Sequence, residues 1–190
     1  PLTEDTDFDA LVSDKVTEDE WKAAFSESAF VNATIESSAE ESGYLKIQEN
    51  MRYMFAENMY GYFVEEDEQK KVYLSEDGEI FTEYPEEEEL INGLYFSFKL
   101  LCPDFSADYA DFTYNEDEGA YVCNTIIQSN PPLSMMKDFD YTNIYIKIID
   151  GKLAAIVCDR AGYDEHYEFH MYDYGKTVVT PPAILESRVA

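Results

Sequence analysis

Four side chains near the C-terminal end are of types that bind metal ions: Asp164, His166, Glu168 and His170. Alternate residues of an extended strand share one face, so these two carboxylates and two imidazoles would lie together. Zinc and other divalent ions accept such ligands. Like-facing neighbours on a strand are about 7 Å apart, so without a second strand only adjacent pairs could share an ion. His166 and His170 are therefore metal-ligand candidates, and the competing interpretation is a solvated strand face opposite the aromatic one.

The sequence contains no motif for nucleophilic catalysis, phosphate binding or calcium binding. There is no G-x-S-x-G nucleophile motif and no glycine-rich phosphate loop. The acidic loop over residues 115–119 is too short for a calcium-binding EF-hand. Paired carboxylates carry no information in a chain with 41 acidic residues. We therefore predict no catalytic residues, no cofactor and no enzyme activity.

Methionine and aromatic residues recur between Met51 and Phe98. They are interpreted first as core, and alternatively as the wall of a pocket for an apolar ligand, because methionine adapts to irregular surfaces. The pocket candidates are Met51, Met54, Phe55, Met59, Tyr62, Leu94 and Phe98.

Composition restricts the possible partners. The formal net charge is −28, which disfavours nucleic acid and anionic lipid surfaces, since both are bound through Lys and Arg. Hydrophobic residues make up 45% of the chain, which is too many for a disordered protein. A solvated acidic coat on a secreted domain is the expected meaning of the charge.

The cysteines, the apolar runs and the first residue bear on metal binding, disulfide formation and targeting. Cys102, Cys123 and Cys158 lack C-x-x-C spacing, so neither a structural zinc site nor a redox motif is predicted. A Cys123–Cys158 disulfide would need neighbouring strands. No apolar run reaches about 18 residues, so no membrane span is predicted. A chain that begins at Pro1 is consistent with a targeting segment having been removed.

The N-terminal part is predicted to contain a tether and a short helix. Residues 1–15 are acidic and lack periodicity, which predicts a flexible tether. Thr17 and Glu20 form a capping box, and Trp21 and Phe25 give the following helix an apolar stripe. A first strand is expected over Ala29–Glu36.

The middle of the chain predicts short strands followed by one long helix. Strands are expected over Tyr44–Gln48, Met51–Ala56, Met59–Glu65, Lys71–Leu74 and Glu79–Glu83, with an Asp-Gly hairpin turn at 77–78. The stretch Met51–Tyr62 fits a helical stripe as well, and periodicity alone leaves both readings open. Pro85–Leu101 is predicted to be an amphipathic helix that Pro103 ends.

The clearest pattern covers the C-terminal part. Alternating runs over Asp140–Ile149, Leu153–Asp159 and Tyr163–Tyr172 predict antiparallel strands, and Phe112–Tyr114 and Ala120–Ile127 predict an earlier hairpin. Residues 16–182 are thus expected to form a single α+β domain, with 183–190 as a tail. Its strongly curved antiparallel sheet would pack on the Pro85–Leu101 helix.

This order of elements resembles a group of uncharacterised exported lipoproteins of Gram-positive gut bacteria. The similar stretches are Val16–Phe25, Ala110–Tyr121 and Tyr172–Pro181. Such proteins are similar in layout to the lipoprotein-carrier folds of the LolA and LppX types, which are half-barrels plugged by helices. The resemblance implies a lipidated Cys upstream of Pro1, anchoring at the outer face of the membrane, a tether over residues 1–15 and no enzyme activity.

The expected function is therefore an extracytoplasmic, non-enzymatic domain that binds an apolar or amphipathic, lipid-like molecule in a sheet–helix cleft. Two alternatives remain open: a divalent-metal site at His166 and His170, and a structural surface module that binds a protein partner.

Overall fold

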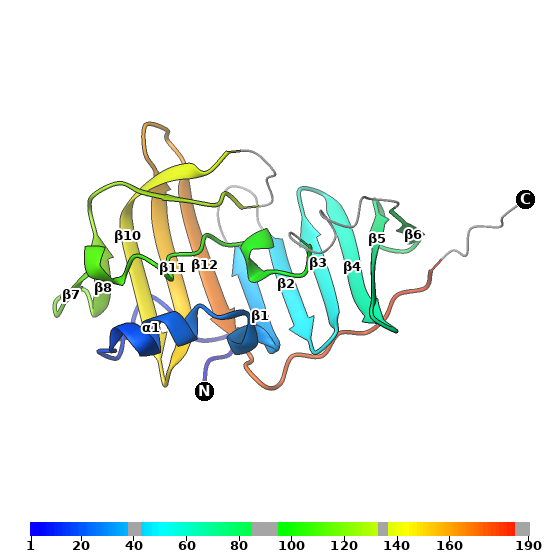
Figure 1. Cartoon of the computed structure of the whole chain (residues 1–190), viewed down its shortest axis with the longest axis horizontal. Helices are drawn as coiled ribbons and strands as arrows, with labels where there is room; N and C mark the ends of the chain where they lie inside the picture. The colour runs from blue at the N-terminus through cyan, green and yellow to red at the C-terminus, as the bar shows by residue number, and fades with distance from the viewer. Residues whose placement is uncertain (38–42, 85–94, 133–136, 185–190) are drawn as a thin grey trace, which may run out of the picture.

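The protein is built on one open antiparallel sheet (Figure 1). The computed structural model describes residues 1–37, 43–84, 95–132 and 137–184. Its 12 strands are ordered β6-β5-β4-β3-β2-β1-β12-β11-β10-β8-β7, and β9 pairs with β10 off this path. The predicted α+β class with an antiparallel sheet is confirmed, and α1 is the one α-helix within those ranges.

Each half of the chain supplies one half of the sheet. The first half forms β1 (Asn32–Ser37), β2 (Gly43–Gln48), β3 (Met51–Ala56), β4 (Met59–Glu66), β5 (Gln69–Ser75) and β6 (Thr82–Glu83). The second half forms β7 (Thr113–Asn115), β8 (Ala120–Cys123), β9 (Ile127–Ser129), β10 (Phe139–Ile149), β11 (Lys152–Arg160) and β12 (His166–Tyr172). The halves join where β1 pairs with β12, with Ile35 opposite Met171.

Tight turns explain why most strands lie where the sequence predicts them. The ambiguous stretch Met51–Tyr62 is two strands, because Glu57 and Asn58 both have positive φ (51° and 61°) and reverse the chain between them. Asp150 and Gly151 do the same between β10 and β11.

Four strand predictions need a change of boundary. Glu79–Glu83 shortens to Thr82–Glu83, and Tyr163–Tyr172 begins only at His166. Ala29–Glu36 begins too early, because Glu27–Phe30 is a 3₁₀ helix (η1) that buries Phe30 completely. Ala120–Ile127 is not one strand. The chain leaves β8 at Cys123 and returns as β9, which pairs with a different part of β10.

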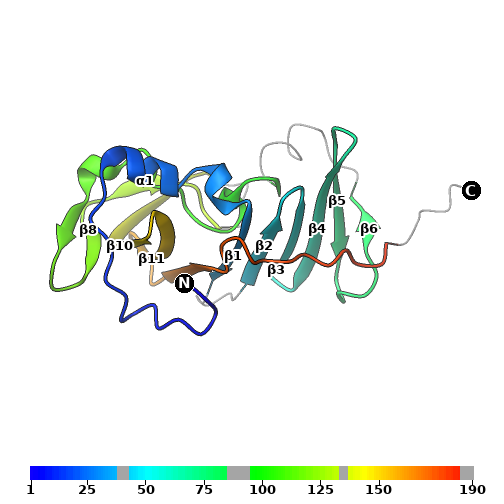
Figure 2. The ribbon, with the colours of Figure 1, turned by 90° about the horizontal axis from the view of Figure 1, so that it is seen from below.

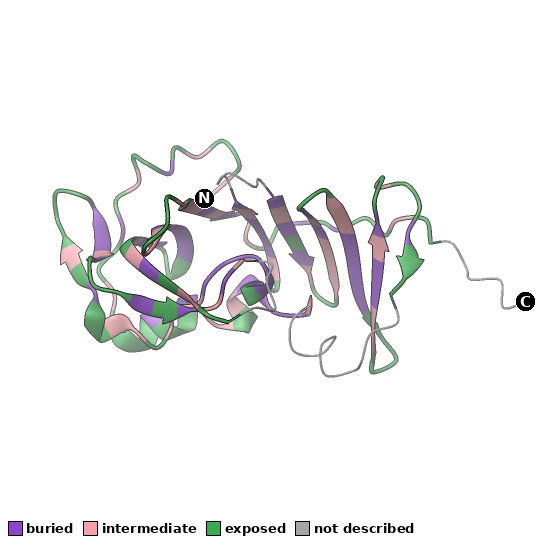
Figure 3. Ribbon diagram, turned by 90° about the horizontal axis from the view of Figure 1, so that it is seen from above, coloured by how far each residue is buried: buried purple, intermediate pink, exposed green. Residues whose placement is uncertain are grey.

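The two faces of the sheet are covered by different segments. We call inner face the side that carries Ile35, Leu45, Phe63 and Ile146, all completely buried. Helix α1 (Glu18–Ala24) packs on this side, and the N-terminal segment lies on the opposite, outer face (Figure 2). Buried residues follow the strands and exposed ones gather in the connections (Figure 3).

The predicted capping box is present at the start of α1. The Glu20 amide donates to Thr17 Oγ1 (3.3 Å), and the Thr17 amide donates to Glu20 Oε2 (2.7 Å).

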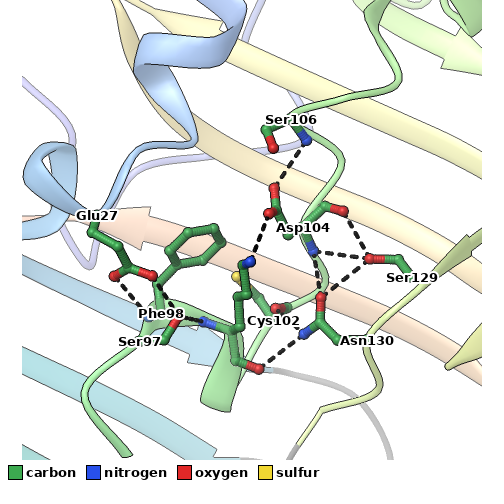
Figure 4. A network of polar contacts seen from close by, with 9 residues as sticks. Glu27, Ser97, Phe98, Cys102, Asp104, Ser106, Ser129 and Asn130 are labelled. Carbon is green, nitrogen blue, oxygen red and sulfur yellow. Dashed lines mark hydrogen bonds and ion pairs between the residues drawn. The ribbon is translucent and has the colours of Figure 1, made fainter. Parts of the chain in front are cut away.

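The predicted helix Pro85–Leu101 does not extend to its expected end. Its residues 85–94 lie outside the described ranges, so that part of the prediction is not tested. Ser97 is extended (φ −113°, ψ 147°), and Phe98–Leu100 forms a short 3₁₀ helix, η3. The cause is a tertiary contact: the Glu27 carboxylate accepts hydrogen bonds from the Ser97 hydroxyl and, at 3.2 Å, from the Phe98 amide (Figure 4). These bonds hold the backbone away from helical geometry and override local propensity.

A polar network then fixes the chain that follows η3 (Figure 4). The Asn130 amide nitrogen donates to the carbonyl oxygens of Lys99 (2.9 Å) and Cys102 (3.1 Å), and its side-chain oxygen accepts from the Asp104 amide (2.9 Å). Ser129 Oγ accepts from the same amide at 3.1 Å and donates to the Asp104 carbonyl oxygen at 2.8 Å. The network holds residues 101–106 on the inner face without regular secondary structure.

The N-terminal segment is not the loose tether that we expected. Phe8 is buried and stacks on His170, with ring centroids 4.2 Å apart and planes 7° from parallel. The Ser13 hydroxyl accepts from the Ile148 amide (2.9 Å), and the Lys147 ammonium donates to the carbonyl oxygens of Phe8 (3.0 Å) and Asp9 (2.9 Å). The segment lacks periodicity because these contacts, rather than its own hydrogen bonds, hold it on the sheet.

The three cysteines are free and buried. Cys123 lies on β8 and Cys158 on β11, with β10 between them. Strands are about 4.8 Å apart, so the Cα atoms are separated by about 9–10 Å, beyond the reach of a disulfide. Burial raises the pKa of the Cys102 and Cys158 thiols, which keeps both protonated at neutral pH.

Candidate functional site

The acidic and histidine side chains of β12 do not converge on a shared ion. His166 and His170 both lie on the outer face, but four residues of strand separate them by about 13 Å. Zinc binds imidazole nitrogen at about 2.0–2.1 Å, so one ion cannot use both rings. In the parts of the chain that the structure describes, no three His, Cys, Asp or Glu side chains are placed to hold a metal ion.

The His166 ring is held between two carboxylates. Its Nδ1 lies 2.7 Å from Asp159 Oδ1, and its Nε2 lies 3.2 Å from Glu168 Oε1. The hydrogen bond to Asp159 raises the pKa of His166, with a smaller contribution from Glu168. Burial alone would raise the pKa of Asp159, but hydrogen bonds from Asn143 and His166 lower it. The arrangement therefore stabilises a positively charged imidazole.

The His166 environment predicts a small pH dependence of stability. The folded-state pKa is raised, so the contribution is complete below about pH 6.5, the unfolded value, and is lost as the pH rises through the folded value. The side chain is 56% exposed, so screening limits the effect to about 1 kcal/mol or less. Urea unfolding of wild type and His166→Gln between pH 5.5 and 8.5 should show a difference that shrinks as the pH rises. An NMR titration midpoint of His166 at or below 6.5 would contradict this assignment.

The predicted pocket residues do not form one cleft. Because residues 51–62 form strands, alternate side chains face opposite sides of the sheet. Met54 and Met59 belong to the inner side, and Phe98 is buried there; Met51, Phe55 and Tyr62 belong to the outer side. Leu94 lies outside the described residues.

The outer face of β2–β5 instead carries an aromatic surface, which we call the tyrosine face. Its members are Tyr44, Tyr53, Phe55, Tyr60, Tyr62 and Tyr73. The first four are half-buried. The Phe55 and Tyr60 ring centroids are 4.7 Å apart, and the Tyr44 and Tyr53 rings lie 6.3 Å apart, within 17° of parallel. The strand register thus gathers rings from four consecutive strands into one continuous surface.

The C-terminal segment crosses this side of the sheet and covers part of it (Figure 2). The Val179 amide donates to Gln48 Oε1 (2.7 Å), and the Thr177 and Thr34 hydroxyls are 2.9 Å apart. Val179 packs with Tyr62, Tyr73 and Phe81. Beside Tyr44 the segment borders a shallow hollow of about 360 Å³ that includes Lys46 and Lys176.

Hydrogen bonding of the hydroxyl group separates the tyrosine face from most other tyrosines, although Tyr145 and Tyr163 also have no hydroxyl hydrogen bond among the described residues. Seven tyrosines elsewhere donate their hydroxyl to a protein acceptor: Tyr109, Tyr114, Tyr121, Tyr141, Tyr167, Tyr172 and Tyr174. The five tyrosines of the tyrosine face have no hydrogen-bond partner among the described residues. Burial raises the pKa of Tyr44, Tyr53, Tyr62 and Tyr73, so these hydroxyls stay neutral and can donate as well as accept. The surface therefore offers flat apolar rings together with available hydrogen-bonding groups.

This difference predicts that removing a hydroxyl group changes the free energy of unfolding little on the tyrosine face and more elsewhere. Tyr53→Phe and Tyr60→Phe should change the free energy of unfolding by less than about 0.5 kcal/mol, because no intramolecular bond is lost. Tyr141→Phe should cost about 1–2 kcal/mol, because Tyr141 is fully buried and its hydroxyl donates to the Asn130 carbonyl oxygen at 2.9 Å. Urea unfolding followed by circular dichroism checks both. Equal losses in the two classes would show that the tyrosine-face hydroxyls have structural partners.

The sequence contained a signal for this surface. Tyr44, Tyr53, Phe55, Tyr60 and Tyr62 recur at alternate positions of predicted strands, but reading their common face required the pairing register.

Comparison with known proteins identifies no relative: no family model matches the chain, and no curated protein is significantly similar to it. Among the helices of the described ranges, none is long and apolar enough to span a membrane.

Proposed function

We propose that the protein is a non-enzymatic binding domain whose tyrosine face binds a neutral amphipathic ligand. The single observation that supports this most strongly is the set of five tyrosine hydroxyls with no described protein partner. Aromatic rings bind the apolar part of a ligand, and tyrosine hydroxyls bind its polar part at a low cost in conformational entropy. In a purely structural aromatic cluster, phenylalanine would serve as well as tyrosine, because the hydroxyl groups would have no role.

A non-ionic amphiphile tests this proposal. Octyl β-glucoside, titrated below its micelle concentration, should shift the ¹³C ε-methyl resonance of Met51, which packs against the tyrosine face. The methyl groups of Met54 and Met171, both buried in the inner-face core, should not shift. Glucose and octanol as separate titrants then distinguish the sugar from the alkyl chain as the recognised part.

A pair of conservative variants provides the specificity control. Tyr53→Phe/Tyr60→Phe removes two hydroxyls and should weaken binding about tenfold, at roughly 0.7 kcal/mol for each lost hydrogen bond. Tyr163→Phe removes an exposed hydroxyl from the β11–β12 connection and should leave the affinity unchanged. An unshifted Met51 resonance, or equal affinity in the double variant and the wild type, would refute the proposal.

A protein partner on the same face is the second candidate. Tyrosine-rich surfaces are typical of protein interfaces, and the half-buried rings span three strands, β2 to β4. A photo-crosslinking amino acid at Phe55 should then join one discrete partner in cells that express the natural gene. The same group at Tyr163 should not, and identical products at both positions would contradict this candidate.

We further propose an extracytoplasmic location with an N-terminal lipid anchor, and a carrier-like half-barrel as the architecture. What supports the architecture is an open antiparallel sheet with a helix on one face; what supports the location is the acidic, soluble composition. Metabolic labelling with an alkyne fatty acid should label the full product of the gene and place it in the detergent phase. An unlabelled product in the aqueous phase would contradict the anchor.

A further inference from the structure

A second, smaller pocket lies next to the β10–β11 turn. Its volume is about 250 Å³, and its apolar wall includes Leu2, Leu11, Ile149 and Tyr174. This is slightly below the range of about 300–1,000 Å³ that is typical of small-molecule pockets. It could therefore hold a ligand with a short apolar body.

The walls of this pocket are positioned by specific contacts. The Asp173 amide donates to the Leu2 carbonyl oxygen (3.1 Å), and the Tyr174 hydroxyl donates to the Leu153 carbonyl oxygen (2.6 Å). The Asp150 amide donates to Asp14 Oδ2 at 2.7 Å. The N-terminal segment, the hairpin turn and the chain after β12 are thus tied to one another around the opening.

Two lysines line the pocket without an acidic partner. The Lys152 ammonium lies 5.5 Å from the centroid of the Tyr174 ring, and Lys176 also lines the pocket. Within the described ranges neither ammonium forms an ion pair, and the same is true of Lys46, Lys70 and Lys71, whereas Lys15, Lys22 and Lys99 each have a carboxylate partner. What sets Lys152 and Lys176 apart is their place: in a chain of net charge −28, both line one pocket together with an apolar wall.

The charges around the pocket select the class of ligand. The charged side chains that line it are two lysines and one carboxylate, Asp150, so their sum is about one positive unit; Pro1 also lines the pocket. A monoanion matches this charge, while a phosphate dianion would face the repulsion of Asp150. The apolar wall requires the rest of the molecule to be aliphatic.

We propose that this pocket binds a medium-chain aliphatic carboxylate, with Lys152 and Lys176 paired to the carboxylate and Leu2, Leu11 and Ile149 in contact with the chain. The site is separate from the tyrosine face and does not depend on the function proposed for that surface. Lys176 also borders the hollow beside Tyr44, so the two sites are neighbours on the outer face.

Sodium octanoate is the probe for this proposal. Titration at pH 7.5 should shift the methyl resonances of Leu2, Leu11 and Ile149 and leave those of Ile35 and Leu45, buried on the inner face, unchanged. Octanol, which has the same chain without the charge, should bind at least tenfold more weakly. Affinity should also fall as the salt concentration rises, because the pairing groups are exposed to solvent.

Charge-removing variants decide the outcome. Lys152→Gln/Lys176→Gln removes both charges and keeps unbranched polar side chains, and it should weaken octanoate binding at least tenfold with an unchanged circular dichroism spectrum. Lys71→Gln, on the outer face of β5, is the matched control and should have no effect. Tyr53→Phe/Tyr60→Phe should bind octanoate normally, which separates this site from the tyrosine face. Equal binding of octanol, unshifted Leu2, Leu11 and Ile149 methyl groups, or wild-type affinity in the double lysine variant would each overturn the proposal.

Discussion

Trp21→Ala should lower the free energy of unfolding by about 3–5 kcal/mol, the usual loss when a fully buried aromatic side chain is truncated. Trp21 is 0% exposed, and its ring centroid lies 4.9–5.6 Å from those of Phe25, Tyr109, Phe112 and Tyr121. Its indole nitrogen donates to the Phe105 carbonyl oxygen at 2.9 Å. One side chain therefore joins α1 to the segment 105–112 and to β8.

Urea unfolding followed by circular dichroism measures this loss. Tryptophan fluorescence cannot serve as the signal, because Trp21 is the single tryptophan of the chain. Trp21→Phe keeps much of the buried area but loses the hydrogen bond, so it should lie between alanine and wild type. Val12→Ala, at a position 66% exposed, should change stability by less than about 0.5 kcal/mol. A loss below about 1 kcal/mol for Trp21→Ala would mean that α1 does not stabilise the inner face.

Asn130→Asp should be the second most damaging of the changes considered, at about 1–3 kcal/mol. The substitution keeps the shape of the side chain but removes the amide donors to the carbonyl oxygens of Lys99 and Cys102. It also brings a carboxylate into a network that already contains Asp104. The segment after η3 would then lose its main attachment to the β9 side of the sheet (Figure 4).

The pH dependence separates this mechanism from a general effect of added charge. Relative to wild type, the loss should shrink below about pH 4, where a protonated aspartate recovers one O–H donor. Asn124→Asp adds the same charge at an exposed position and should change stability little at any pH. Equal losses in the two variants would contradict the proposed role of the network.

Local sequence predicted most of the strands because strand and turn signals act over short distances. Alternation of apolar and polar residues marks a strand whose two faces differ, and residues that accept positive φ mark the turns between them. Only one reading of Met51–Tyr62 accommodates a turn at Glu57–Asn58, but its helical stripe of methionine and aromatic residues was equally visible. The side chains that seemed to share one helical face lie on opposite sides of the sheet.

The two errors of greatest consequence both involve long-range contacts. The hydrogen bonds from Ser97 and Phe98 to Glu27 join residues about seventy positions apart, and no local pattern reveals them. The same is true of Phe8 and His170, whose stacking turns a supposed tether into a cover for the outer face. The candidate sites depend on these contacts, because they lie where distant segments meet.

The sequence by itself determined the α+β class, the capped helix at Thr17 and the alternating character of nearly every strand, since each follows from the backbone preferences of adjacent residues. Only the tertiary structure decided that β1 pairs with β12, which face of each strand is covered, and which tyrosine hydroxyls have no described partner. Alternation says that a strand has two different faces, but the segment that packs on each face is chosen by contacts between distant parts of the chain.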